Sequence, residues 1–330
     1  MTSSPSLKIN FADFWATFDK KNNLFYRILS EKYEVIISED PDILFYSCYG
    51  WEYLKFNCIR IFYTAENKKL DFTAADFGIS FEFLDRKNHY RFPFYAYRIL
   101  SSNNLDKLCQ KFTEQEAERQ WEQKKRFCCM VVSNPGAKKR IEFFQNLNNL
   151  KKVDSGGGTL NNIGGRISNK LEFISKYKFV LAFENESFPG YLTEKLVDGI
   201  LAGGIPVYWG DPLVGNVFNV ERFIHYRPGE NEEDIFATIF NMEKDKEKYM
   251  EILRKPVFRN NTIPDVLEID NLSQFLFYCI SESKNRKPVA KTAKKYLHQL
   301  NIKKRKLQKK LIFLNRRLNF LQKIKKNFIG

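Results

Sequence analysis

The sequence has few histidines and no clustered cysteines. Its three histidines lie far apart, at His89, His225 and His298, and its six cysteines show no paired metal-ligand spacing. This distribution argues against a zinc site and against a Ser-His-Asp triad. The cysteines are Cys48, Cys58, Cys109, Cys128, Cys129 and Cys279. Because several of them fall in apolar runs, we expect mostly buried, reduced thiols in a reducing compartment.

Long hydrophobic runs are also missing. No stretch of 18 apolar residues occurs, and residues 1 to 5 have neither a basic start nor an apolar core. The sequence therefore predicts no membrane-spanning helix and no secretory signal, which favours a cytoplasmic protein. With no cluster of metal-ligating residues in sight, we expect no metal site.

Acidic residues are absent from the end of the chain. Residues 284 to 330 contain 17 lysines and arginines and no aspartate or glutamate, whereas the preceding residues contain 37 basic and 39 acidic side chains. The formal net charge of +15 therefore belongs to this tail alone. The slightly acidic body and the absence of any recognised reading motif argue against nucleic acid as a partner.

Apolar residues in the tail recur at spacings of three, four and seven, which predicts one face of an amphipathic helix. They are Leu300, Leu307, Leu311, Leu314, Leu318, Leu321 and Phe328. A basic helix of this kind favours binding of residues 286 to 330 to an anionic membrane surface. The alternatives are a coiled-coil seam that forms a homodimer and a helix docked on the protein's own surface.

The most informative segment encodes a strand, a helix and a second strand. Apolar runs at residues 179 to 183 and 205 to 209 are typical of parallel strands buried on both faces. Thr193 is placed to cap the helix between them, and Lys195 lies in its first turn. Ligands bind at the carboxyl ends of such strands, and the free N–H groups of a helix start favour an anion. We therefore expect the loop at 184 to 191 to face a negatively charged ligand.

Several motifs follow one another in order along the chain. They are Phe62-Tyr63-Thr64-Ala65-Glu66-Asn67, Asp76-Phe77-Gly78-Ile79, Gly156-Gly157-Gly158, Asn169 to Tyr177, Phe183-Glu184-Asn185, Tyr191 to Asp198 and Gly204 to Gly210. Together they resemble the α-1,3-fucosyltransferases of glycosyltransferase family 10, the earlier motifs on the acceptor side and the later ones on the donor side. The resemblance covers roughly residues 7 to 280.

Length and pattern indicate two domains. At 330 residues the chain exceeds the size at which one hydrophobic core usually keeps growing. The resemblance implies the α/β arrangement called GT-B, in which two Rossmann-like domains face each other across a cleft. We expect an acceptor-binding domain at residues 1 to 120, a GDP-fucose-binding domain at 121 to 283 and a basic amphipathic helical tail at 284 to 330.

The resemblance also implies the reaction, an inverting transfer of L-fucose from GDP-fucose to a GlcNAc hydroxyl. It points to an α-1,3 linkage on a β-galactosyl-GlcNAc glycan of lipopolysaccharide or O-antigen, made at the inner face of a bacterial cytoplasmic membrane, with no cofactor required. The alternatives are an α-1,4 or dual linkage, a different nucleotide-sugar donor on the same fold, and a non-catalytic protein that binds a membrane surface or nucleic acid.

A base must take the proton from the attacking hydroxyl. Glu66 follows a predicted strand, and on residue type alone it would be an ordinary solvated loop glutamate. The resemblance makes it the catalytic base. Four more residues are predicted to line the site: Tyr63 and Asn67 near Glu66 in sequence, and Ser133 and Asn134 in the loop before Arg140.

Cations must hold the charge that develops on the leaving diphosphate. The resemblance assigns this role to Arg140 and Lys195, although Arg140 also reads as one of several solvated basic residues. It assigns the ribose hydroxyls to Glu194, whose alternative is a glutamate that stabilises the helix dipole. Asn185 and Tyr191 are predicted to touch the sugar or the diphosphate, and a buried anchor for the loop is the alternative for Tyr191.

Overall fold

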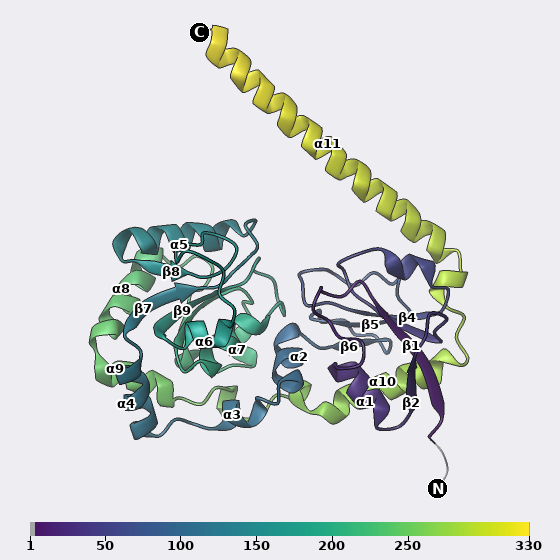
Figure 1. Cartoon of the computed structure of the whole chain (residues 1–330), viewed down its shortest axis with the longest axis horizontal. Coiled ribbons are helices and arrows are strands. Elements are labelled where there is room, and N and C mark those ends of the chain that lie inside the picture. The colour runs from purple at the N-terminus through teal and green to yellow at the C-terminus, as the bar shows by residue number, and fades with distance from the viewer. Residues whose placement is uncertain (1–3, 330) are drawn as a thin grey trace.

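The structure, a computed structural model, describes residues 4 to 329, of which 309, 313 and 315 to 329 are described by backbone alone. It contains two parallel sheets in separate lobes, with one long helix projecting away from the first lobe (Figure 1). The predicted α/β class is confirmed.

The first sheet has six parallel strands in the order β2-β1-β3-β4-β5-β6. They are β1 (Ser6–Ala12), β2 (Glu34–Ile37), β3 (Ile43–Tyr46), β4 (Ile59–Tyr63), β5 (Phe77–Ser80) and β6 (His89–Arg91). Strands β3, β4 and β5 are buried along their whole length, which explains their continuous apolar runs. The helical elements of this half are α1 (Leu24–Ser30), η1 (Glu52–Lys55) and α2 (Phe94–Ser101).

The second sheet has five parallel strands in the order β11-β10-β9-β7-β8. They are β7 (Arg126–Met130), β8 (Val153–Ser155), β9 (Tyr177–Phe183), β10 (Ile205–Trp209) and β11 (Ile224–His225). The helices of this half are α3 (Leu105–Cys109), α4 (Glu114–Gln123), α5 (Lys138–Leu150), α6 (Lys170–Ile174), α7 (Glu194–Leu201), α8 (Glu232–Lys244) and α9 (Lys246–Arg254), with short 3-10 turns η2 (Val214–Asn216), η3 (Val220–Arg222), η4 (Arg259–Asn261) and η5 (Asp265–Leu267). The predicted strand–helix–strand unit is thus β9-α7-β10.

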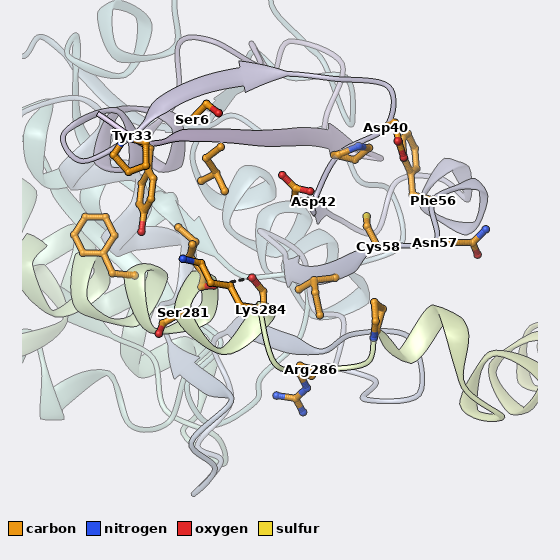
Figure 2. A pocket seen from close by; sticks show the side chains of 18 of the residues that line it. Ser6, Tyr33, Asp40, Asp42, Phe56, Asn57, Cys58, Ser281, Lys284 and Arg286 are labelled. Carbon is orange, nitrogen blue, oxygen red and sulfur yellow. Dashed lines mark hydrogen bonds between the residues drawn. The ribbon is translucent and has the colours of Figure 1, made fainter. Parts of the chain in front are cut away.

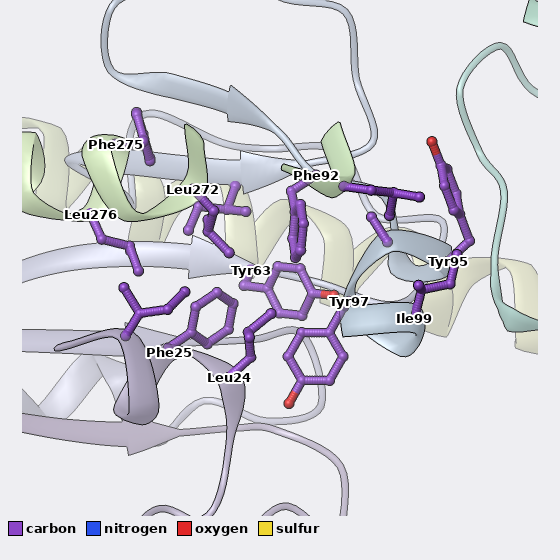
Figure 3. Close-up of a cluster of buried hydrophobic side chains, with 14 of the residues drawn as sticks. Leu24, Phe25, Tyr63, Phe92, Tyr95, Tyr97, Ile99, Leu272, Phe275 and Leu276 are labelled. Atoms are coloured by element: carbon purple, nitrogen blue, oxygen red, sulfur yellow. The ribbon is translucent and has the colours of Figure 1, made fainter. Parts of the chain in front are cut away.

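Helix α10 (Ile269–Ser283) follows the second sheet in sequence but packs on the first. Its Leu272, Phe275 and Leu276 lie in one buried cluster with Leu24 and Phe25 of α1 (Figure 3). The sequence-based boundary, which placed 121 to 283 in one domain, therefore differs from the packing. A boundary read from chain order cannot detect a helix whose apolar face is covered by a distant sheet.

The two lobes share a buried contact. Helix α7 packs against β9 and β10 on one side and against α2 on the other, and its Leu196, Val197 and Ile200 belong to the same cluster as the first sheet's core. Arg98 of α2 donates to Asp198 of α7 at 3.1 Å. This contact joins helix α7 of the second lobe to helix α2 and the core of the first lobe.

The basic composition of the tail starts at residue 284, but the chain stays packed on the first lobe as far as Ile302. After η6 (Val289–Lys291) the chain forms α11 (Lys294–Ile329). Val289 and Ile302 are buried on the first lobe, and the Val289 N–H donates to Asp76 Oδ1 at 2.9 Å. The side chains of four of the predicted leucines are 43 to 61% exposed: Leu300, Leu307, Leu311 and Leu314. Those of Leu318, Leu321 and Phe328 lie outside the described residues.

Candidate active site

A cavity of about 250 Å³ lies beyond the carboxyl ends of β4 and β9, and both halves of the chain line it. The first half contributes Trp15, Tyr49, Ala65, Glu66 and Phe94, and the second contributes Asn185, Tyr191, Thr193, Glu194 and Lys195. The predicted base and the predicted residues of the donor loop and helix therefore lie around one cavity, although they are more than a hundred residues apart in sequence.

Glu66 is held in place from both sides of this cavity. Tyr49 donates its hydroxyl to Glu66 Oε1 at 3.0 Å, and Asn185 of the other lobe donates to Oε2 at 3.5 Å. The Glu66 N–H donates to the Thr64 hydroxyl at 3.0 Å. Burial, reinforced by the Glu66 carboxylate, raises the pKa of Tyr49, so this phenol stays a donor. Glu66 is thus an oriented carboxylate rather than a freely solvated loop glutamate.

The start of α7 is organised by Glu184, a fully buried carboxylate at the end of β9. It accepts from the Thr193 N–H at 2.7 Å, from the Thr193 hydroxyl at 2.7 and 2.9 Å, and from Lys195 Nζ at 2.9 Å. The Thr193 hydroxyl therefore serves Glu184 and does not cap its own helix, contrary to the prediction. A buried acid that takes several donors is costly to remove, because it would leave those donors unpaired.

Glu194 and Lys195, the first two residues of α7, both stay charged. Burial lowers the pKa of Lys195, but Glu184 and Glu194 outweigh it and raise the value. For Glu194, burial raises the pKa, but Lys195 and Lys170 outweigh it and hold the pKa well below its usual range. Lys170 Nζ lies 3.2 Å from Glu194 and 2.8 Å from Asp198. A carboxylate that remains ionised offers acceptors only, as a pair of sugar hydroxyls requires.

This charged network makes a prediction about pH. A glutamate whose pKa is depressed on folding stabilises the protein above its unfolded pKa of about 4.3, and that contribution is lost as the pH falls toward the folded value. The free energy of unfolding should therefore decrease below about pH 4, and Glu194→Gln should remove part of that decrease. Urea titrations of both proteins across this range measure it. Identical pH dependence in the two would contradict the coupling of Glu194 to Lys170 and Lys195.

Arg140 is buried in the first turn of α5 rather than solvated. Its guanidinium donates to the Phe183 carbonyl at 3.1 Å and to the Asn134 carbonyl at 3.0 Å, while its Nε has no partner among the described residues. Burial lowers its pKa, and the charges of Glu184, Tyr191 and Glu194 oppose that shift. A buried cation with a spare donor at the carboxyl end of β9 suits an anion. Arg140 does not line the 250 Å³ cavity itself.

The four further predicted positions have different environments. Tyr63 is fully buried, with its ring centroid 5.1 Å from that of Phe25 and 5.4 Å from that of Tyr97, so it belongs to the core and not to the site (Figure 3). Asn67 lies at the edge of the cleft, where its amide donates to Glu186 of the other lobe. Ser133 and Asn134 are exposed in the loop after β7, and only Asn134 supports the site, through its carbonyl bond to Arg140.

Tyr191 is a buried residue that also lines the cavity, and its contact with the sugar or the diphosphate stays a prediction. Its side chain is 2% exposed and its ring packs 5.3 Å from that of Phe81, yet it lines the cavity. The sequence reasoning did not identify Tyr49, Glu184 or Lys170 as site residues. Glu184 and Lys170 belong to the motifs that resemble the family. Their bonds to Thr193, Lys195, Glu194 and Asp198 are visible only in the structure.

A larger cavity, of about 950 Å³, lies at the amino ends of the strands of the first sheet (Figure 2). It is bordered by the starts of β1 and β4, the end of α10 and the segment that leads to α11. Asp40, Asp42 and Arg286 are among its charged side chains. Because ligands of parallel α/β sheets bind at the carboxyl ends of the strands, we assign the function to the smaller cavity.

The described residues offer neither a metal-binding cluster nor a membrane-spanning helix. No group of three or more His, Cys, Asp or Glu side chains is placed there to hold a metal ion. All six cysteines are free thiols; three are buried, and Cys109 is exposed. No helix within the described residues combines the length and apolar character needed to span a bilayer.

The chain has two α/β domains, each with a parallel sheet. Glu66 lies on one wall of the cleft between them and Lys195, at a helix start, on the other. This arrangement defines a GT-B protein that can hold an anionic sugar donor. Two family models match the chain. The α-(1,3)-fucosyltransferase FucT N-terminal domain matches residues 9 to 98, and the C-terminal model of glycosyltransferase family 10 (fucosyltransferase) matches residues 121 to 268. The chain belongs to glycosyltransferase family 10.

Individual relatives agree with this assignment. The α-(1,3)-fucosyltransferase FucT of Helicobacter pylori is 32% identical over 291 residues, which is 76% of this chain and 60% of that protein. A crystal structure of an α1,3-fucosyltransferase is 27% identical and superposes with a TM-score of 0.69 over 87% of this chain and 92% of that one. A crystal structure of an α1,3-fucosyltransferase with GDP-fucose gives 0.66 over 88 and 92%, again at 27% identity. The predicted GT-B fold is thereby confirmed, and the chain spans about 60% of the length of the H. pylori relative.

Proposed function

We propose that this protein transfers L-fucose from GDP-fucose, with inversion, to the 3-hydroxyl of GlcNAc in a β-galactosyl-GlcNAc glycan. The observation that carries the proposal is the hydrogen-bonded position of Glu66 across the cavity from Glu194 and Lys195. Support for this donor comes from the family and from the related α1,3-fucosyltransferase whose crystal structure is with GDP-fucose.

Each residue has a role in this reaction. Glu66 takes the proton of the attacking hydroxyl while Tyr49 and Asn185 keep its carboxylate aimed into the cavity. Lys195 and Arg140 stabilise the negative charge that grows on the leaving diphosphate. Glu194 accepts hydrogen bonds from the ribose hydroxyls. Tyr191 and Asn185 form the wall nearest the sugar. These roles require no metal ion and no further cofactor.

The linkage and the donor can be tested together. The purified protein should transfer fucose to a type 2 disaccharide, whose GlcNAc has a free 3-hydroxyl, and should ignore GDP-mannose and UDP-sugars. Preferred transfer to a type 1 disaccharide, whose GlcNAc has a free 4-hydroxyl, would indicate α-1,4 linkage instead. Transfer to both would indicate dual specificity, and transfer from a different donor would replace fucose by another sugar.

We further propose that residues 286 to 330 hold the enzyme on an anionic membrane surface, at the inner face of a bacterial cytoplasmic membrane. There it would meet an acceptor such as a lipid-linked O-antigen or lipopolysaccharide glycan. Support comes from the 17 basic residues after position 283 and from the exposed leucines of α11. The same leucines suit a coiled-coil homodimer, which is the alternative.

Two truncations separate the tail from the body. Deletion from Gln308 onward removes seven lysines and arginines and leaves the docked start of α11, so it should preserve turnover of a soluble disaccharide. At about 1 kcal/mol per basic residue, it should weaken binding to anionic vesicles by more than about 100-fold. Deletion from Arg286 also removes buried Val289 and Ile302, and should lower the melting temperature.

Vesicle sedimentation, light scattering and thermal melting measure these effects. Equal vesicle binding by the full chain and by both truncated proteins would exclude the membrane role. A change from dimer to monomer without any vesicle binding by either protein would establish the coiled coil instead.

A further inference from the structure

His298, near the start of α11, is buried against the first lobe with 5% of its surface exposed. Both of its ring nitrogens have partners there. Nε2 lies 2.6 Å from the Tyr53 hydroxyl, and Nδ1 lies 3.2 Å from Asp71 Oδ2 and 3.3 Å from the Thr73 hydroxyl. Among the described side chains of α11, Lys295 makes one hydrogen bond to the first lobe, to Asn57, so His298 makes the larger share.

The hydrogen-bond partners of His298 determine which of its ring nitrogens donates. An ionised carboxylate only accepts, so Nδ1 carries a proton toward Asp71 and Nε2 is left to accept from Tyr53 in the neutral ring. The His298 N–H and the Thr73 donors hold the pKa of Asp71 well below its usual range. The chain Asp71–His298–Tyr53 is therefore an oriented set of hydrogen bonds and not an incidental contact.

Tyr53 and Asp71 lie on the two segments that hold Glu66. Tyr53 comes four residues after Tyr49, the residue that donates to Glu66 at 3.0 Å. Asp71 comes five residues after Glu66 itself, in a turn closed by its bond from the Thr73 N–H at 2.9 Å. His298 thus bridges, from outside the cavity, the segment that orients the base and the segment that carries it.

Tyr53 itself is firmly placed, so it can transmit this constraint. Its N–H donates to Asp13 Oδ2 at 2.8 Å, its ring stacks 4.4 Å from that of Tyr46, and the Arg60 guanidinium lies 5.3 Å from its ring centroid. A shift of Tyr53 would therefore move the short stretch from Tyr49 that contains the Glu66 donor.

We infer that His298 is a positioning residue for Glu66, and that the first turns of α11 support, from outside the cavity, the two segments that carry Tyr49 and Glu66. This inference rests on the proposed transfer reaction. Helix α11 carries both His298 and the exposed leucines that follow it. A membrane surface or a second chain bound by these leucines would therefore be linked, through His298, to the position of Glu66.

The position of α11 does not depend on His298 alone, which makes a control available. Ile302 is 7% exposed on the same docked face, Lys295 donates to Asn57 at 3.1 Å, and Lys306 lies 5.4 Å from the ring centroid of Trp51. Ile302→Ala loosens the packing of α11 and removes none of the hydrogen bonds from His298 to Tyr53 and Asp71. It is the matched control for His298→Ala.

The test compares turnover per GDP-binding site, which corrects for any unfolded fraction. We expect His298→Ala to lower kcat about tenfold and to leave the Kd for GDP within about twofold of wild type, because the donor wall is on the other lobe. Tyr53→Phe, which keeps the stacked ring, should lower kcat less and should add little to His298→Ala in the double variant. His298→Gln, whose amide can replace Nε2, should recover part of the loss.

Amide hydrogen exchange gives a readout that does not depend on catalysis. In His298→Ala, residues 49 to 53 and 64 to 71 should exchange faster, while residues 191 to 198 should be unchanged. Unchanged exchange in the first two segments would overturn the inference, even in a protein that proved inactive. So would unchanged kcat in His298→Ala, or an equal loss of kcat in Ile302→Ala. Absence of transfer by the wild-type protein, with the expected exchange pattern, would instead count against the proposed reaction alone.

Discussion

Glu66→Gln is expected to abolish fucosyl transfer while leaving the affinity for GDP nearly unchanged. The substitution keeps the shape and the bond from Tyr49 but removes the proton acceptor. Loss of a general base typically costs a factor of about 10² to 10⁴ in rate. Initial rates with GDP-fucose and a soluble disaccharide, together with calorimetry of GDP binding, measure both sides of this expectation.

Glu186→Gln is the matched control, because Glu186 lies on the same cleft and bonds to Asn67. It should lower turnover by no more than about fivefold, since a single cleft hydrogen bond is worth about 1 kcal/mol. Turnover of Glu66→Gln within tenfold of wild type would remove Glu66 as the base. A large, equal loss in both variants would indicate that closing the cleft, and not proton transfer, limits the rate.

Lys195→Ala and Arg140→Ala should each weaken GDP binding by roughly 10- to 100-fold, since a hydrogen bond to a charged group contributes about 1.5 to 3 kcal/mol. Arg140 is buried and the Lys195 side chain is 14% exposed beside the end of β9, so little water competes with a bound anion there. Calorimetric titration with GDP measures the change. The Lys195 variant should also melt at a lower temperature, because buried Glu184 loses its ion partner.

Lys138→Ala is the control for these two variants. Lys138 lies in the same helix as Arg140, but its side chain is 87% exposed and pairs with Glu142 on the surface. Its loss should leave GDP affinity within about twofold, as expected of a surface ion pair. GDP affinity that is unchanged in the Lys195 or Arg140 variant would exclude that residue from the diphosphate site.

Local patterns predicted much of the fold. The strand–helix–strand unit from β9 to β10 could be predicted because a buried parallel strand, an amphipathic helix and the helix-ending pair Gly203-Gly204 each have a short-range signal. Glu66, Glu194 and Lys195 were predicted from the family resemblance, and the structure places them around one cavity.

The features that local patterns did not predict depend on contacts between residues far apart in the sequence. A capping rule assigned the Thr193 hydroxyl to its own helix, because nothing local reveals that Glu184 is buried next to it. Tyr63 was predicted to line the site, but it ends a strand that is buried on both faces, so its ring packs in the core. Composition likewise began the tail at residue 284, whereas the body includes the docked His298 and Ile302.

A transfer assay with defined product analysis tests the central claim most directly. The purified full chain is incubated with GDP-fucose and a type 2 disaccharide, in parallel with GDP-mannose and UDP-sugars, and the product is characterised by nuclear magnetic resonance. The account predicts a single fucosyl product on the GlcNAc 3-hydroxyl, from GDP-fucose alone, with an anomeric configuration opposite to that of the donor. A product with retained configuration, or transfer from another nucleotide sugar in preference to GDP-fucose, would contradict it.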